Sequence, residues 1–170
     1  MIKMFGLAAS TLVLAACNMV PGSNAPTATA TLRPASGTQV QGQVTFTQVG
    51  NDRVRVTGDL TGQSGTKGFH IHEKGDCSAA DAMSAGAHFN PGKVKHGSSP
   101  ATGHAGDMGN IVFSDAGRAI IDKTFEGLSV SRDAANGIVG RAVIVHMQSD
   151  DLKTDPTGNA GGRAACGVIS

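Results

Sequence analysis

From Thr38 onward, apolar residues recur at every second position, and this period of two limits the chain to β-strands. Val40, Val44 and Phe46 are separated by polar side chains, and residues 54–60 repeat the pattern. Successive side chains of a strand point to opposite faces, so such alternation is typical of half-buried antiparallel strands. Glycine makes up 24 of the 170 residues, roughly twice its usual share, which fits many turns between short strands.

Strands are predicted at residues 40–46, 54–60, 67–73, 110–114, 118–125, 137–147 and 164–169. No helical stripe of useful length is present. Residues 75–109 and 149–163 lack periodicity, and long loops inside a compact domain are usually functional. The predicted fold is an all-β sandwich or flattened β-barrel with two long functional loops.

Charge excludes one class of partner. Lysine and arginine total 14 against 13 aspartate and glutamate residues, and they form no basic stripe. A nucleic-acid partner is therefore not expected. The length suits one domain with one core.

The N-terminal segment predicts export. Residues 1–16 combine one lysine with an apolar run too short for a membrane span, as in a secretory signal peptide. The string LAAC ending at Cys17 resembles a bacterial lipobox, which implies lipidation of Cys17 and membrane attachment through that lipid. The alternative is an ordinary signal peptide with an incidental cysteine. Asn18 after the cysteine suggests the outer membrane of a Gram-negative envelope.

A composition change separates the leader from the domain. Residues 18–37 are rich in Pro, Ala, Thr, Ser and Gly and nearly uncharged, so they bury too little apolar surface to offset the entropy of ordering. Residues 17–37 are therefore predicted to be a lipidated N-terminus and flexible tether, and residues 38–170 to be the folded domain.

The remaining cysteines form an even pair. With Cys17 assigned to the lipid, Cys77 and Cys166 are left in an exported chain. A disulfide between them would close a loop of about 90 residues, worth about 4–5 kcal/mol in the chain-entropy model. Two free buried thiols are the alternative.

All six histidines fall between positions 70 and 146. The strand period places His70 and His72 on one face, so both rings can reach one ion. Three more histidines recur at intervals of eight, followed by an aspartate, and these are His88, His96, His104 and Asp107. Three imidazoles and a carboxylate form a tetrahedral zinc set. His146 ends an apolar strand, where a histidine can be a polar cap and not a metal ligand. For His88, His96 and His104 the alternative is a polar loop with scattered histidines.

Five strings carry a resemblance to a known family. GFHIHEKGDC, SAGAHFNP, HGSSPATGHAGDMGN, IVHMQSDD and TGNAGGRAACGVI resemble the copper/zinc superoxide dismutases in order and register, over about residues 38–170. The resemblance implies a Greek-key fold, one copper and one zinc per chain, and dismutation of superoxide to oxygen and hydrogen peroxide, here protecting a bacterial cell envelope or periplasm.

The resemblance also implies residue roles. It implies copper ligands at His70, His72, His88 and His146, and zinc ligands at His88, His96, His104 and Asp107. His88 would bridge the metals. Further implied roles are a link between the two histidine sets for Asp150, an anion site for Arg163, a channel lining for Thr157, and the Cys77–Cys166 disulfide.

One loop departs from the commonest pattern of this family, and three other functions are possible on the same residues. The loop 149–162 is short compared with the corresponding loop of the eukaryotic members and has Lys153 as its one cation, which puts steering of superoxide by that loop in doubt. A copper-binding or copper-delivery lipoprotein on the same fold would lack a ligand or Arg163, and a copper-only dismutase would lack the zinc ligands. A zinc hydrolase would need a general base that the motifs do not supply. Monomer and homodimer both stay open.

Overall fold

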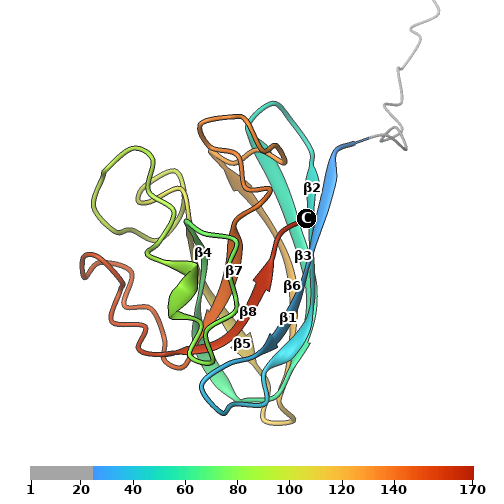
Figure 1. Ribbon diagram of the computed structural model, residues 1–170, viewed down its shortest axis with the longest axis vertical. Coiled ribbons are helices and arrows are strands. Elements are labelled where there is room, and N and C mark those ends of the chain that lie inside the picture. Colours follow the sequence, from blue (N-terminus) through green and yellow to red (C-terminus); the bar gives the residue numbers. More distant parts are fainter. Residues whose placement is uncertain (1–24) are drawn as a thin grey trace, which may run out of the picture.

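A computed structural model describes residues 25–170 and has eight strands with one short 3₁₀ helix (Figure 1). These are β1 (Thr27–Pro34), β2 (Gln41–Gln48), β3 (Arg53–Thr61), β4 (Gly65–His72), η1 (Met83–Ala85), β5 (Asp107–Phe113), β6 (Arg118–Glu126), β7 (Ala142–His146) and β8 (Arg163–Val168). The predicted all-β fold is confirmed, and every predicted strand overlaps an observed one.

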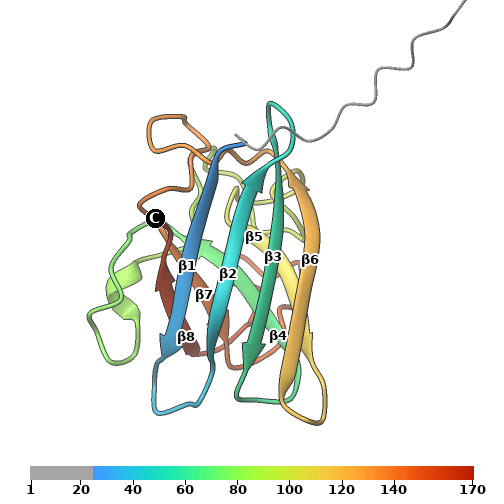
Figure 2. The same ribbon diagram turned by 90° about the vertical axis from the view of Figure 1, so that its right-hand side faces the viewer.

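The strands form one antiparallel sheet in the order β5-β4-β7-β8-β1-β2-β3-β6. Strands β1, β2, β3 and β6 lie side by side across one face (Figure 2). The edge strands β5 and β6 are joined by a tight turn, in which Gly117 N–H donates to the Ser114 carbonyl at 2.8 Å. The sheet therefore curls into a nearly closed barrel. Because β3 pairs with β6 and β4 with β7, the connections cross between the two halves, as in a Greek key.

Strand β1 corrects one prediction. The flexible tether predicted over residues 17–37 is wrong for residues 27–34, and the predicted domain start at residue 38 is too late. Ala28, Ala30 and Leu32 are buried, and β1 pairs with β2 over residues 27–32 and with β8 at residues 33–34. Alanine is small and buries little area, so the alternation along these residues gives only a weak strand pattern. Their order comes from hydrogen bonds to two neighbouring strands.

The N-terminal predictions lie outside the described residues. The signal peptide over residues 1–16 and the lipidated Cys17 both precede residue 25. Within residues 25–170, the chain has no helix that combines the length and the apolar character needed to span a membrane.

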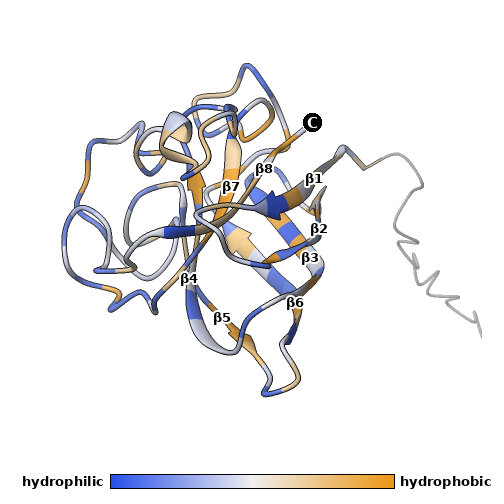
Figure 3. Cartoon of the chain, turned by 60° about the horizontal axis from the view of Figure 1, so that its bottom comes forward, coloured by the Kyte–Doolittle hydropathy of each residue, from blue (hydrophilic) through white to orange (hydrophobic). Residues whose placement is uncertain are grey.

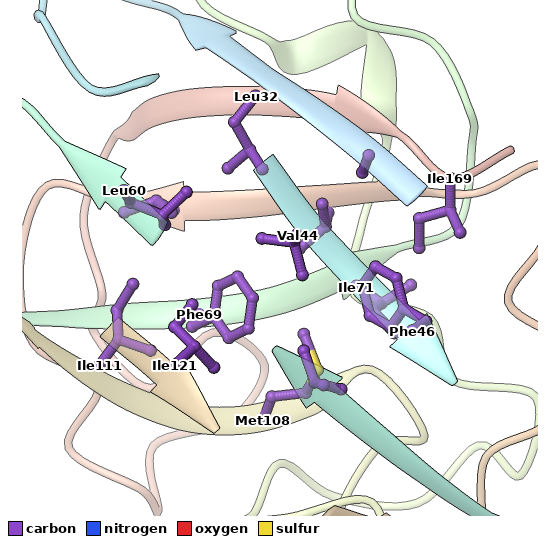
Figure 4. Close-up of a cluster of buried hydrophobic side chains, with 14 of the residues drawn as sticks. Leu32, Val44, Phe46, Leu60, Phe69, Ile71, Met108, Ile111, Ile121 and Ile169 are labelled. Carbon is purple, nitrogen blue, oxygen red and sulfur yellow. The ribbon is translucent and has the colours of Figure 1, made fainter. Parts of the chain in front are cut away.

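The core fills the space between the two halves of the barrel, and Figure 4 shows part of it. Its largest buried side chains include Leu32, Phe46, Phe69, Ile71 and Phe113. Hydrophobic and hydrophilic residues alternate along the strands, as Figure 3 shows for β3 and β6. Burial of alternate side chains is the main favourable term for such a sheet.

Two long loops cover the β4 and β7 side of the barrel (Figure 1). One joins β4 to β5 and the other joins β7 to β8. The first loop is fixed to β8 by the predicted disulfide between Cys77 and Cys166, whose Cα atoms lie 5.7 Å apart. The alternative of two free thiols is therefore wrong.

Candidate metal centre

All six histidines and two aspartates meet where the long loops cover the barrel. His70 and His72 end β4, His146 ends β7 and Asp107 begins β5, while the other members belong to the two loops. Two overlapping groups have ligand-type atoms within 4.8 Å of one another. The first donor set is His70, His72, His88 and His146, and the second donor set is His88, His96, His104 and Asp107. Every member is buried.

The period of two in β4 creates the first donor set. Phe69 and Ile71 point into the core, so the alternate His70 and His72 point to the other face, as predicted, where the loops bury them. The Nδ1–H of His72 donates to the Gly86 carbonyl at 2.9 Å, and its Nε2 lies 3.4 Å from Nε2 of His146. The Nδ1–H of His146 likewise donates to the Gly161 carbonyl at 3.2 Å. Backbone carbonyls thus fix the rings of His72 and His146 and leave Nε2 of each directed inward.

His88 belongs to both donor sets. Its Nδ1 lies 2.9 Å from Asp107 Oδ1 on the side of the second donor set. Its Nε2 is buried without a hydrogen-bond partner, and its ring centroid lies 4.1 Å from that of His70 in the first donor set. One imidazole therefore presents a nitrogen to each set.

Asp107 gathers the second donor set around one oxygen. Its Oδ1 lies 2.9, 3.1 and 3.3 Å from the Nδ1 atoms of His88, His96 and His104. Its Oδ2 accepts backbone N–H groups of Gly97 and His104 at 2.9 and 2.8 Å. Burial opposes ionisation, but the hydrogen bonds from His88 and Gly97 and the nearby imidazoles outweigh it and hold the pKa of Asp107 below its usual value.

Asp150 links the two sets through a fully buried carboxylate. Oδ2 accepts Nε2–H of His70 at 2.8 Å, and Oδ1 accepts Nε2–H of His96 at 2.9 Å. Asn110 of β5 in turn holds the backbone of Asp150, donating to its carbonyl at 2.9 Å and accepting its N–H at 2.8 Å. Sequence reasoning missed Asn110, because nothing near it in sequence indicates contact with a loop 40 residues away.

Four buried ring nitrogens test whether metals fit the donor sets. His70 Nδ1, His88 Nε2, His96 Nδ1 and His104 Nδ1 have no hydrogen-bond partner in the described part of the chain. A buried polar atom without a partner costs about 1–3 kcal/mol, so four in one place need compensation. Four imidazoles suit copper, and three imidazoles with one carboxylate suit zinc. The residues therefore fit a copper ion and a zinc ion.

Protonation also favours metal binding. Burial, followed by the neighbouring imidazoles, holds the pKa values of His70 and His72 well below the usual value. Burial likewise lowers the pKa of His146 to about 4. Neutral imidazole is the form that binds metal, so His70, His72 and His146 are ready to bind at neutral pH.

A cavity of about 730 Å³ opens onto both donor sets, and Arg163 and Thr157 line it beside His72, His88, His104 and His146. The Arg163 guanidinium donates to the carbonyls of Ala82 and Gly86, the first at 2.6 Å. These carbonyls lie in the loop that Cys77 ties to β8. The cavity thus presents an oriented cation beside the first donor set, which suits a small anion.

The comparisons with known proteins agree with this geometry. The family model described as copper/zinc superoxide dismutase matches residues 40–169. The chain is 48% identical over 143 residues to an extracellular Cu-Zn superoxide dismutase of Drosophila melanogaster, covering 78% of this chain and 76% of that one. It is 43% identical over 138 residues to a Cu-Zn superoxide dismutase of Brassica juncea, covering 76% and 89%. A crystal structure of the clock protein EA4 is similar with a TM-score of 0.76 and 44% identity, covering 86% of this chain and 94% of that one.

Proposed function

Because the chain belongs to the copper/zinc superoxide dismutase family, we propose that it dismutates superoxide to oxygen and hydrogen peroxide at the two donor sets. The observation that carries the proposal is His88, whose two nitrogens face the two sets next to the Arg163 cavity. A copper-delivery protein on this fold is less well supported, because such a protein is expected to lack a metal ligand or Arg163, and this chain has all of them.

The proposed ligands follow the donor sets. The first donor set, His70, His72, His88 and His146, would hold one copper, and the second donor set, His88, His96, His104 and Asp107, would hold one zinc. Copper supplies one-electron redox chemistry, which zinc lacks. Asp150 would keep the proton of His70 and of His96 on Nε2, which directs both Nδ1 atoms toward the metals.

The chain's other residues handle the anion and the proton. Arg163 holds superoxide by a charge-assisted hydrogen bond, and Thr157 lines its approach. His88 can carry a proton on Nε2 while Nδ1 stays in the second donor set, and it can donate that proton to the forming peroxide. The net reaction converts two superoxide anions and two protons into one oxygen and one hydrogen peroxide.

Metal content and superoxide consumption, measured together on the chain without residues 1–17, test this function. We expect one copper and one zinc per chain and activity that cyanide abolishes. His88→Ala should uncouple the metals and remove most activity. Both metals bound without activity would instead favour the copper-handling protein, and full activity of His88→Ala would contradict the shared-ligand role.

We also propose that the protein acts in a bacterial envelope, lipid-anchored through Cys17 to the outer membrane after removal of residues 1–16. The LAAC string and the Cys77–Cys166 disulfide, which is typical of oxidising compartments, support this location. Residues 18–24 would then connect the lipidated Cys17 to the folded domain. Labelling with an alkyne fatty acid should mark the wild type and not Cys17→Ser. Equal labelling of the wild type and Cys17→Ser would contradict lipidation. Sedimentation of the purified chain would decide whether it is a monomer or a homodimer.

A further inference from the structure

His104 differs from the other imidazoles of the second donor set in the partner of its far nitrogen. Nε2 of His88 faces the first donor set, and Nε2 of His96 donates to Asp150. Nε2 of His104 faces Asp155 instead, at 3.7 Å from Oδ1. The same oxygen accepts the backbone N–H of His96 at 2.9 Å. One carboxylate oxygen therefore touches two consecutive histidines of the set.

The contact between Asp155 and His104 affects which nitrogen of His104 carries the proton. Its Nδ1 faces Asp107 at 3.3 Å, so a neutral His104 that binds metal through Nδ1 carries its proton on Nε2, toward Asp155. At 3.7 Å the interaction is longer than a hydrogen bond, but a carboxylate at that distance still favours this tautomer and makes the ligand more basic. The Asp155 side chain is 52% exposed, so the effect is moderate.

Asp155 also connects the set to the cavity loop. Asp150 and Asp155 both belong to the β7–β8 loop, which also carries Thr157, and Asp155 itself lines the cavity. Asp151 organises this loop internally, accepting the N–H and hydroxyl of Thr154 at 2.8 and 2.6 Å and the amide of Asn159 at 2.9 Å. The loop is thus a small ordered unit that touches the second donor set at two carboxylates.

We propose that Asp155 is a positioning residue for the zinc set, which ties the β7–β8 loop to His96 and His104. Zinc binding then stabilises the β7–β8 loop, because zinc fixes the His104 ring in the position where Asp155 contacts it. The ordered loop in turn strengthens zinc binding. The inference rests on the proposed function, since it requires zinc at the second donor set.

Zinc titration of the metal-free chain, in competition with a chromogenic chelator, tests the inference. Asp155→Asn keeps an oxygen for the His96 N–H but removes the charge, and we expect about tenfold weaker zinc binding, with a larger loss for Asp155→Ala. Asp155→Glu should restore part of the affinity. Asp115→Asn is the matched control, because it makes the same charge change in the β5–β6 turn, at the other end of β5 from Asp107.

Hydrogen exchange supplies a second readout that zinc affinity alone does not give. In the wild type, zinc should protect the amides of Asp151 and Gly158, which bond to the Gly158 and Thr154 carbonyls at 2.8 and 2.7 Å. Asp155→Ala should lose most of that protection at saturating zinc. Zinc affinity and protection both within twofold of wild type would overturn the inference. Failure of the wild type to bind zinc, or unchanged zinc binding in His104→Ala, would instead overturn the proposed function on which it rests.

Discussion

Reduction of the Cys77–Cys166 disulfide should destabilise the metal-free protein strongly. The bond spans 89 positions. For a closed loop of about 90 residues the chain-entropy relation gives about 15 cal/mol/K, or about 4–5 kcal/mol at 25 °C. For a domain of this length, 1 kcal/mol corresponds to about 2–4 °C. The melting temperature should therefore fall by about 10–20 °C.

The assay is equilibrium unfolding in urea of the oxidised and reduced chain, with Cys17→Ser removing the third thiol. Reduction changes no side-chain volume apart from the bond itself, so the difference isolates the crosslink. The variant Cys77→Ser/Cys166→Ser, treated with the same reductant, controls for other effects of the reagent. A loss below about 1 kcal/mol would refute the reasoning, because the loop would then already be restricted in the unfolded chain.

The same reduction should also reach the cavity. The disulfide fixes the loop that presents the Ala82 and Gly86 carbonyls to Arg163. Freed from β8, that loop should orient the guanidinium less well. We therefore expect slower superoxide consumption by the reduced, metal-loaded protein at a temperature where it stays folded. An unchanged rate would mean that packing alone holds the loop.

Three further perturbations have defined outcomes. Arg163→Ala should slow superoxide consumption about tenfold to 100-fold with both metals retained, since a hydrogen bond to a charged group is worth about 1.5–3 kcal/mol; an unchanged rate would reject the anion role. Asp150→Asn leaves one imidazole N–H facing an amide donor, so zinc affinity should fall about tenfold to 100-fold, whereas Asp151→Asn, whose side chain bonds within its own loop, should retain zinc. Acid should destabilise the metal-free protein. In the unfolded chain His146 gains a proton below about pH 6.5, whereas burial holds its pKa in the folded chain at about 4. The free energy of unfolding therefore falls by about 3 kcal/mol between these pH values from this group alone. A urea midpoint that stays constant between pH 6.5 and 4 would contradict the buried neutral state of His146.

The strand predictions show where local pattern is sufficient. Residues 67–73 alternate strongly, and β4 follows with Phe69 and Ile71 in the core and His70 and His72 on the other face. Strand β1 shows where pattern fails, because its buried residues are mostly alanines and its stability depends on pairing with β2 and β8. A neighbour far along the chain has no signature within a short window of sequence.

Alternation, cysteine number and residue chemistry are local properties, so the amino-acid sequence was sufficient to predict the all-β class, the even cysteine pair and the side chains that the fold gathers into the two candidate donor sets. Only the folded chain establishes which nitrogen of each ring faces inward, that Asn110 holds Asp150, and that Asp155 reaches His96 and His104. These contacts join β5 and the two loops across the barrel, and their geometry depends on how the sheet closes. The spacing of residues along the chain does not determine how the sheet closes, so it cannot predict these contacts.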